Sequence, residues 1–508
     1  MSKRSALLLC AQSLLPIPWA AAAPADPVST GDLLIEHVTI VSPQLAQSLP
    51  DRNVLVRSGR SAKIGGNSVT APASTPRLDG HGKFLTPGLM DSHVHVTDAI
   101  GLPPQAVYLS SQQDTPLTRM RDAYYRQQPR SYLYFGVTQL LDLANSPNGI
   151  AAFRAQPLGP DLFRCGATMP LDGYPSLFAD KSVRYSVFPD YIYEPANQKE
   201  HPLPADADAA AHTPEAVVDR IARTDAICVK VFIEDGFGDM TGWPMLSMES
   251  LKRLRAAADK HKLLLVAHAN ALDMQQIAVQ VPVDVLAHGV WNWGHALANA
   301  PGVPQPIQDH LRVVHAKHIG YQPTLRVMAG TAALFQPGTL DDPMYAKIVP
   351  PELLDWYRSA DGQWFKRQLK GEFDNLPDER IVAVQMHIDE QGARAMVFLQ
   401  QLGHPILLGS DTPSAPTYGN QPGYDTYREM QLMAKAGLDP RAIFEAATLN
   451  NARQFRLEKD YGTVQTGKIA NLLLLDADPL HSVDAWNQIE RVILHGKVIE
   501  RESLTVPH

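Results

Sequence analysis

Residues 85–95 read LTPGLMDSHVH, an apolar run that ends in two histidines, His93 and His95. Alternate residues of a β-strand point to the same side, so both imidazoles project together from one strand end. Two such imidazoles suit a shared metal ion. An isolated His-x-His pattern is weak evidence, because most such pairs are incidental, and the rest of the chain decides its meaning.

Short apolar runs recur along the chain with helical patterns between them. Thr213, Ser247 and Asp439 each supply a capping side chain at an expected helix start. Strands that alternate with helices predict an α/β protein with a (β/α)8 TIM-type barrel, whose active site lies at the carboxyl ends of the strands. The expected strands span residues 84–95, 137–143, 162–169, 227–233, 263–268, 283–288, 320–325 and 405–411.

Three further candidate ligands end strands of this barrel. His268 ends the fifth expected strand, His288 ends the sixth, and Asp411 ends the eighth. The carboxyl ends of barrel strands converge, so we expect these side chains to lie beside His93 and His95. The sequence therefore predicts a metal centre at this end of the barrel.

Lys230 lies in an otherwise apolar strand, AICVKVFIE at residues 226–234. A charged ammonium there is costly unless it is paired or chemically altered. Two interpretations stay open. Reaction with carbon dioxide would give a carbamate, an anionic oxygen ligand able to bridge two cations. Alternatively, Lys230 pairs with the carboxylate of Asp411 or Glu234.

The two ends of the chain do not fit the barrel. Residues 31–85 and 463–501 read as short strands with turns, and we expect them to form one small β-sandwich domain beside a barrel of residues 86–462. The loops after the first, third and seventh strands, at 98–135, 172–215 and 326–400, are long enough to shape a binding site or a lid.

Residues 1–22 have the pattern of a secretory signal peptide. Lys3 and Arg4 precede a short apolar stretch that ends in small residues. We therefore expect export to the periplasm or the outside, with a membrane anchor as the alternative. Cys165 and Cys228 would remain after cleavage, both inside apolar runs; export permits a disulfide, but we expect buried thiols.

Composition bears on the kinds of partner. Lys plus Arg is 45 against 53 for Asp plus Glu, a net charge of -8, and no stretch concentrates basic residues, so there is no footprint for nucleic acid. No apolar run reaches the roughly 18 residues of a membrane span. We expect a small-molecule substrate, no nucleic-acid partner, and no membrane partner after signal removal.

Several segments together resemble the amidohydrolase superfamily, in the branch near imidazolonepropionase and the prolidase-like enzymes. They are LTPGLMDSHVH (85–95), GVT (136–138), VLAHG (285–289), LGSDT (408–412), AATLNNA (446–452) and GTVQTGKIANLLLLD (462–476). The resemblance covers nearly the whole mature chain and is far more specific for the superfamily than for a substrate. One departure follows Lys230, where residues 231–238 read VFIEDGFG and many prolidase-like members carry small residues and glycines.

The resemblance implies roles for the candidate ligands. The more buried metal would be bound by His93, His95 and Asp411, and the second metal by His268 and His288. Carbamylated Lys230 would bridge the pair. Members of this type usually carry zinc, so the resemblance implies two zinc ions per chain.

The expected activity is that of a zinc-dependent amidohydrolase, a hydrolase of carbon–nitrogen bonds, peptide bonds included. Metal-activated hydroxide would attack the amide of a dipeptide or an N-acyl amino acid. Asp411 would take the proton from the attacking water and pass it to the leaving amine. The alternatives are a cyclic amide hydrolase or deaminase, which often uses one metal and lacks the lysine, and a non-catalytic binding protein on the same scaffold.

Overall fold

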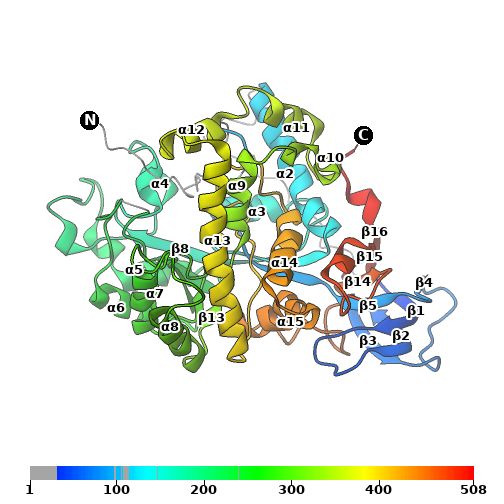
Figure 1. The fold of residues 1–508 in the computed structure, drawn as a ribbon. Helices are drawn as coiled ribbons and strands as arrows, with labels where there is room; N and C mark the ends of the chain where they lie inside the picture. Colours follow the sequence, from blue (N-terminus) through cyan, green and yellow to red (C-terminus); the bar gives the residue numbers. More distant parts are fainter. Residues whose placement is uncertain are drawn as a thin grey trace.

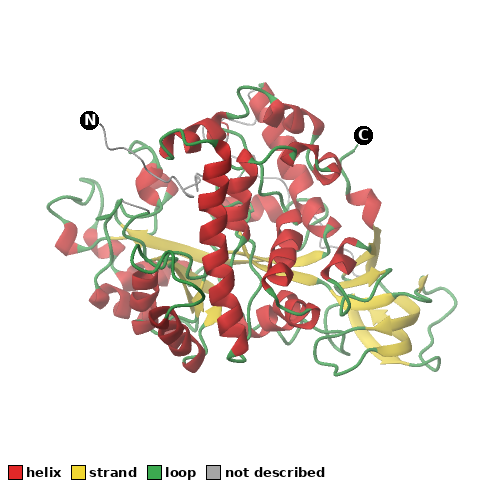
Figure 2. Ribbon diagram, viewed as in Figure 1, coloured by secondary structure: helices red, strands yellow, loops and turns green. Residues whose placement is uncertain are grey.

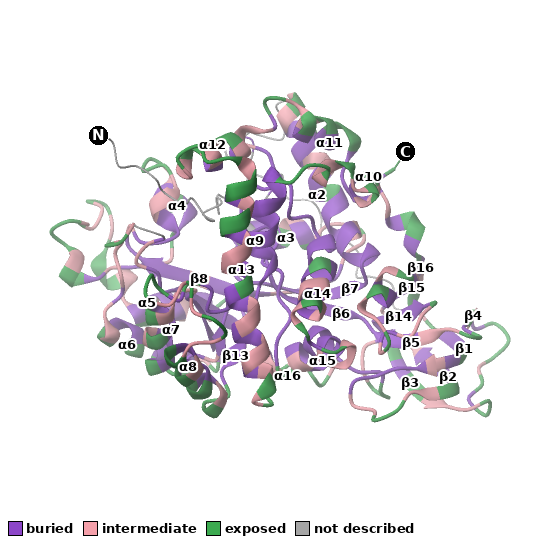
Figure 3. Ribbon diagram, in the orientation of Figure 1, coloured by how far each residue is buried: buried purple, intermediate pink, exposed green. Residues whose placement is uncertain are grey.

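The computed structural model of this chain describes residues 31–96, 99–103, 106, 114–145, 147–237 and 240–507. Its centre is a parallel sheet in the order β6-β7-β8-β10-β11-β12-β13, with β9 (Tyr191–Ile192) beside β8 and helices packed around it (Figures 1 and 2). The strands are β6 (Leu89–Val94), β7 (Val137–Asp142), β8 (Asp161–Pro170), β10 (Cys228–Phe232), β11 (Leu264–His268), β12 (Val285–Leu286) and β13 (Gly320–Tyr321). Figure 3 shows the labelled strands β6, β7, β8 and β13 as largely buried, as expected for a parallel sheet that is covered on its outer face by helices.

The segment expected as the eighth strand, residues 405–411, closes this sheet through isolated bridges instead of a regular strand. Ile406 pairs in parallel with Tyr321 of β13, and Thr412 pairs in parallel with Val94 of β6. The segment therefore joins the two edges of the sheet, and the result is a TIM-like α/β fold.

Side chains explain why this segment lacks a regular ladder. The Leu408 amide donates to Asn451 Oδ1 at 3.2 Å, and the Ser410 amide donates to Asp91 Oδ1 at 3.0 Å. Backbone groups that bond to side chains are not free to extend a strand pairing. The prediction of a strand here was wrong in this respect, although the position of the segment in the barrel is the expected one.

The helices begin where capping residues predict. Thr213, Ser247 and Asp439 each accept a backbone amide within the first helical turn. The helices are α2 (Pro116–Tyr134), α3 (Pro147–Arg154), α4 (Arg184–Val187), α5 (Pro214–Ile221), α6 (Met248–Lys260), α7 (Leu272–Gln280), α8 (Gln305–Ala316), α9 (Arg326–Ala332), α10 (Pro343–Ile348), α11 (Pro351–Arg358), α12 (Trp364–Glu372), α13 (Asp378–Gln401), α14 (Tyr424–Ala436), α15 (Pro440–Glu445) and α16 (Asn451–Gln454).

The expected long loop at residues 326–400 is helical. It contains α9 to α13, and the 24-residue α13 runs along the front of the molecule in Figure 1. Ile381, Gln385 and Ala395 are among the buried residues of α13, at the spacing of one helix face. This stretch therefore packs against the barrel as a layer of helices, and the expectation of a loop was wrong. In contrast, residues 172–215 hold only short elements.

Strands from both ends of the chain form a second sheet, at the lower right of Figure 1. Its order is β16-β15-β14-β5-β1-β2-β3, with β4 beside β1, and β14 pairs antiparallel with β5. The strands are β1 (Leu33–Ile40), β2 (Leu49–Arg57), β3 (Arg60–Gly65), β4 (Arg77–Asp79), β5 (Phe84–Pro87), β14 (Leu472–Leu475), β15 (Ile489–Leu494) and β16 (Lys497–Glu500). A division into the two facing sheets of a sandwich, and the domain boundaries, stay predictions.

Gly88 marks the point where the chain passes from the second sheet into the barrel. The expected strand at 84–95 is in fact two strands, β5 and β6, one in each sheet. A Cβ atom at Gly88 would lie 1.9 Å from Thr138 Oγ1, so only glycine fits the close approach of the chain to β7.

Cys165 and Cys228 form a disulfide bond. They lie opposite each other on the neighbouring parallel strands β8 and β10, with their Cα atoms 4.4 Å apart. The expectation of two buried thiols was wrong, because the sequence does not reveal the register that makes the two cysteines direct neighbours.

The expected signal peptide, residues 1–22, lies outside the described residues. Within residues 31–507, apart from the gaps given above, no helix has both the length and the apolar character of a membrane span.

Candidate metal centre

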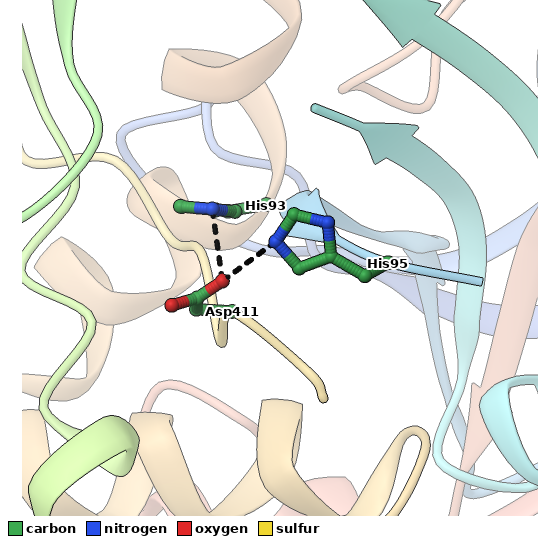
Figure 4. A group of neighbouring side chains, drawn as sticks. All are labelled: His93, His95 and Asp411. Carbon is green, nitrogen blue, oxygen red and sulfur yellow. Dashed lines mark hydrogen bonds and ion pairs between the residues drawn. The ribbon is translucent and has the colours of Figure 1, made fainter. Parts of the chain in front are cut away.

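Three of the expected ligands meet at one atom. Asp411 Oδ1 lies 2.9 Å from His93 Nε2 and 3.0 Å from His95 Nε2 (Figure 4). Among the described residues these three form the one group of His, Cys, Asp and Glu side chains whose ligand atoms lie close enough to hold a metal ion. Their nitrogen and oxygen atoms suit a divalent transition metal such as zinc.

The backbone at Asp411 aims its carboxylate at the two histidines. Asp411 has a φ of +55°, in the left-handed region that residues other than glycine seldom adopt. Its amide donates to the His93 carbonyl at 2.8 Å. Burial opposes ionisation of Asp411, but its interactions with His93 and the hydrogen bond from His95 lower its pKa well below the ordinary value. The carboxylate is therefore held in its anionic form, the form that can coordinate a metal.

His268 and His288 lie next to this group. The ring centroids of His268 and His288 are 4.5 Å apart, and those of His93 and His288 are 5.1 Å apart. His288 Nδ1 lies 4.0 Å from Asp411 Oδ2. The structure thus brings the four expected histidines and Asp411 together at the carboxyl ends of their strands.

In two of the site histidines, His93 and His288, the Nδ1 atom is engaged in a hydrogen bond to the protein. His93 Nδ1 bonds to the Ala287 carbonyl oxygen at 3.0 Å, and His288 Nδ1 bonds to Thr324 Oγ1 at 3.0 Å. In each ring Nε2 is then the nitrogen that remains for a metal. Burial lowers the pKa of His93 to about 4 and that of His288 well below the ordinary value, so both rings are neutral and able to coordinate.

Lys230 lies within β10 and is only 1% exposed. Its Nζ is 5.5 Å from the centroid of the Phe232 ring. In the part of the chain that the structure describes, Lys230 forms no ion pair with Asp411 or Glu234, so the ion-pair interpretation gains no support. Burial lowers the pKa of Lys230 to about 7, although the Asp411 carboxylate partly opposes this, and a substantial fraction of the amine is neutral at physiological pH.

Asp91 and Asn451 are site residues whose roles the sequence did not reveal. Asp91 Oδ1 accepts the amides of His93 and Ser410, and Asn451 Nδ2 donates to the carbonyls of Met90 and Leu408 at 2.8 Å each. Both side chains tie β6 to the segment that ends in Asp411. Both stand inside segments that carry the family resemblance, LTPGLMDSHVH and AATLNNA, which is the signal that could have found them.

Aromatic side chains adjoin His268. The Tyr174 ring lies 4.8 Å from the His268 ring and is stacked on the half-buried Trp243, with centroids 5.7 Å apart. Phe237 contacts both Tyr174 and Trp243. Tyr174 is therefore next to the metal centre, and no periodic pattern in the sequence could have placed Trp243 there.

Tyr321 and His295, which lie within or shortly after expected barrel strands, do not join this cluster. Tyr321 is fully buried, and its hydroxyl accepts the Val290 amide at 2.8 Å. His295 lies exposed in the segment after β12.

Sequence comparison finds two partial matches. Residues 367–499 match the model of the Amidohydrolase family. Over 68 residues the chain is 31% identical to adenine deaminase 1 of Desulfotalea psychrophila, a match that covers 13% of this chain and 10% of that protein. The matched part of the chain therefore spans about one tenth of the length of this relative.

Solved structures share the fold over most of the chain. An amidohydrolase covers 92% of this chain and 99% of its own, with a TM-score of 0.64 and 18% identity. The structure of molinate hydrolase covers 94% of this chain and 97% of its own, with a TM-score of 0.64 and 17% identity. The structure of a Xaa-Pro dipeptidase with bound methionine covers 92% of this chain and 100% of its own, with a TM-score of 0.61 and 16% identity. At these identities the likeness concerns the fold.

Proposed function

Because the chain belongs to the amidohydrolase superfamily, we propose that it is an exported, binuclear zinc hydrolase that cleaves the C–N amide bond of a small substrate. The observation that best supports this function is the convergence of His93 and His95 on Asp411 Oδ1, with His268 and His288 alongside. A largely buried cluster of imidazoles and one carboxylate has the chemistry of a metal site.

The residues present fit two zinc ions. His93, His95 and Asp411 would hold the more buried ion, and His268 and His288 the second. When bound, zinc polarises a substrate carbonyl and lowers the pKa of a coordinated water to about 7. The left-handed φ of Asp411, +55°, is the kind of backbone strain that clusters at functional sites and supports a role in the reaction.

Lys230 is proposed to bridge the two ions as a carbamate. Its neutral amine would form an N–C bond with carbon dioxide and release one proton, which leaves a singly charged anionic oxygen ligand. The pKa of about 7 that burial gives Lys230 supports this, because only the neutral amine reacts. The lack of an ion pair to Lys230 within the described residues supports it as well.

Asp411 is proposed to move the proton. Its carboxylate would accept a proton from the attacking water and donate it to the nitrogen of the leaving amine. The two hydrogen-bonded histidines orient the carboxylate, so little reorganisation is needed at the moment of reaction.

The substrate is proposed to be a dipeptide or an N-acyl amino acid with an apolar group. The buried rings of Tyr174 and Phe237 and the half-buried ring of Trp243 give an apolar environment beside His268. One solved structure with this fold is a Xaa-Pro dipeptidase, which supports an amide of this size. The sequence after Lys230 departs from the prolidase-like pattern, so proline is not proposed as the preferred residue.

Deamination is the second candidate, because the chain matches a short stretch of adenine deaminase 1. Lys230 argues against it, since superfamily members with that chemistry often lack this lysine. Incubation of the zinc-loaded protein with dipeptides, N-acyl amino acids, cyclic amides and aminopurines distinguishes the two. We expect release of a free amino acid. Turnover of aminopurines alone would reject amide hydrolysis and indicate that the protein is a deaminase.

Export is proposed from the N-terminal sequence pattern. The disulfide between Cys165 and Cys228 supports it, because such bonds persist in oxidising compartments. The N-terminal sequence of protein recovered from the periplasm or medium tests this, with cleavage expected near Ala22.

A further inference from the structure

Glu234 and His268 face each other through two buried atoms. Glu234 Oε2 lies 3.3 Å from His268 Nε2, and the two side chains are 1% and 6% exposed. Across the described residues, neither atom has a hydrogen-bond partner, and the contact between them is recorded by distance alone. A buried polar atom without a partner is costly, so two such atoms at this separation point to an interaction between them.

The strand register brings the two residues together. β10 and β11 are parallel neighbours, with Phe232 opposite His268, and the Ile233 amide donates to the His268 carbonyl at 2.9 Å. Glu234 follows directly and therefore lies beside the imidazole. It also belongs to the segment at which the sequence departs from the prolidase-like pattern.

The other histidines show how the site is organised. His93 and His288 each have Nδ1 bonded to a protein oxygen, which leaves Nε2 for a metal. At His268 the arrangement is reversed, because the protein oxygen lies beside Nε2. The same logic leaves Nδ1 of His268 as the coordinating atom.

We propose that Glu234 is a positioning residue whose carboxyl accepts a hydrogen bond from His268 Nε2, and that this bond holds the tautomer in which Nδ1 binds the second metal. The inference rests on the proposed metal site. Tyr174 and Phe232, whose rings lie 4.8 Å and 5.6 Å from that of His268, limit the motion of the imidazole and exclude water. A hydrogen bond in such surroundings is stronger than one exposed to water.

The first test measures zinc affinity by competition with a chelator. Glu234→Ala should lower the affinity for one of the two zinc ions by about 10- to 100-fold, the usual effect of losing the partner of a metal-binding histidine. Glu234→Gln keeps an accepting oxygen and should stay within about threefold of wild type. Asp235→Asn is the matched control, since this neighbouring acid is half-exposed and, among the described residues, no hydrogen bond or ion pair joins it to His268. Unchanged zinc affinity in Glu234→Ala would overturn the proposal, and so would equal losses in the Ala and Gln variants.

The second test needs no metal and separates this proposal from the proposed function. Nitrogen-15 NMR of histidine-labelled, metal-free protein reports the tautomer of each ring, and His268→Asn identifies the signals of His268. We expect the Nε2–H tautomer in wild type and Glu234→Gln, and a mixture in Glu234→Ala. Glu234→Leu, similar in volume, replaces Glu234→Ala if the latter does not fold. A fixed Nε2–H tautomer without zinc binding would support the role of Glu234 and reject the zinc enzyme; the Nδ1–H tautomer in wild type would overturn the role of Glu234.

Discussion

The carboxylate of Asp91 accepts a hydrogen bond from the backbone amide of Ser410, at 3.0 Å. The same oxygen accepts the His93 amide at 3.2 Å, and the other oxygen accepts the Thr426 hydroxyl at 2.6 Å. One buried side chain therefore joins the strand that presents His93 and His95 to the segment that presents Asp411. The geometry of the candidate metal centre depends on this link between the first and last parts of the barrel.

Replacement of Asp91 by alanine should damage the site without removing a ligand. The buried amides of Ser410 and His93 would lose their acceptor, at about 1–3 kcal/mol for each unsatisfied group. We expect the free energy of unfolding to fall by at least about 2 kcal/mol and zinc affinity to fall with it. Asp91→Asn, which can still accept both amides, is the control. Denaturant unfolding and zinc titration measure both effects, and an Ala variant with wild-type zinc affinity would contradict this view of Asp91.

The metal stoichiometry should be about two divalent ions per chain. Five side chains and a carbamate exceed the four ligands of one tetrahedral zinc. Elemental analysis of protein purified without chelator measures the ratio. A stoichiometry of one that does not change when zinc is added would reject the binuclear site.

Lys230→Ala should lose the bridging ligand, bind metal less tightly and lose most activity. Because the proposed bridge is chemically a carboxylate-like anion, formate or acetate should restore part of the activity. Activity and metal content, each measured with and without the added acid, test this. Full activity and full metal content in Lys230→Ala would rule out a carbamate bridge at this residue.

The barrel and the convergence of the candidate ligands at one end of it were largely predictable from the sequence, because both depend on local patterns. Apolar runs of strand length reveal strands, and a histidine or aspartate at the end of such a run is expected at the carboxyl end of the barrel. His93, His268 and His288 follow this rule. Lys230 was detectable for the opposite reason, since its charge interrupts an apolar run.

Features that depend on register or on distant partners were not predictable. The disulfide needs Cys165 opposite Cys228, and the contact between Glu234 and His268 needs the alignment of β10 with β11. The irregular segment before Asp411 results from hydrogen bonds to Asp91 and to Asn451, which lie far from it in the sequence. No periodicity within one segment encodes such pairs.

His310 should make the stability of the protein depend on pH. It is buried, its Nε2 bonds to Gln275 Oε1 at 2.9 Å, and burial lowers its pKa to about 4. Between pH 4 and about 6.5 the unfolded chain then binds more protons at this residue than the folded protein. The contribution of His310 to stability is therefore complete above pH 6.5 and is lost as the pH falls to 4, by about 3 kcal/mol.

His310→Gln removes this titration. Its free energy of unfolding should fall less steeply than that of wild type between pH 6.5 and 4, as measured by denaturant unfolding at several pH values. His81→Gln, at an exposed position, is the control and should keep the wild-type slope. Parallel slopes for His310→Gln and wild type would contradict the prediction.

Asp411→Asn separates the two roles proposed for Asp411, as a ligand and as a proton carrier. Asparagine keeps an oxygen that can coordinate, but its amide is a far poorer base than a carboxylate. We expect kcat to fall by at least about 100-fold, the low end of the usual contribution of a positioned acid or base. KM should change little, because the residue is not proposed to contact the ground-state substrate. Metal content should stay near that of wild type, since the other ligands remain. Kinetics and elemental analysis on the same preparation decide the outcome. Unchanged turnover with retained metal would exclude Asp411 as the proton carrier, and loss of metal would show that its carboxylate charge is needed to hold the ions.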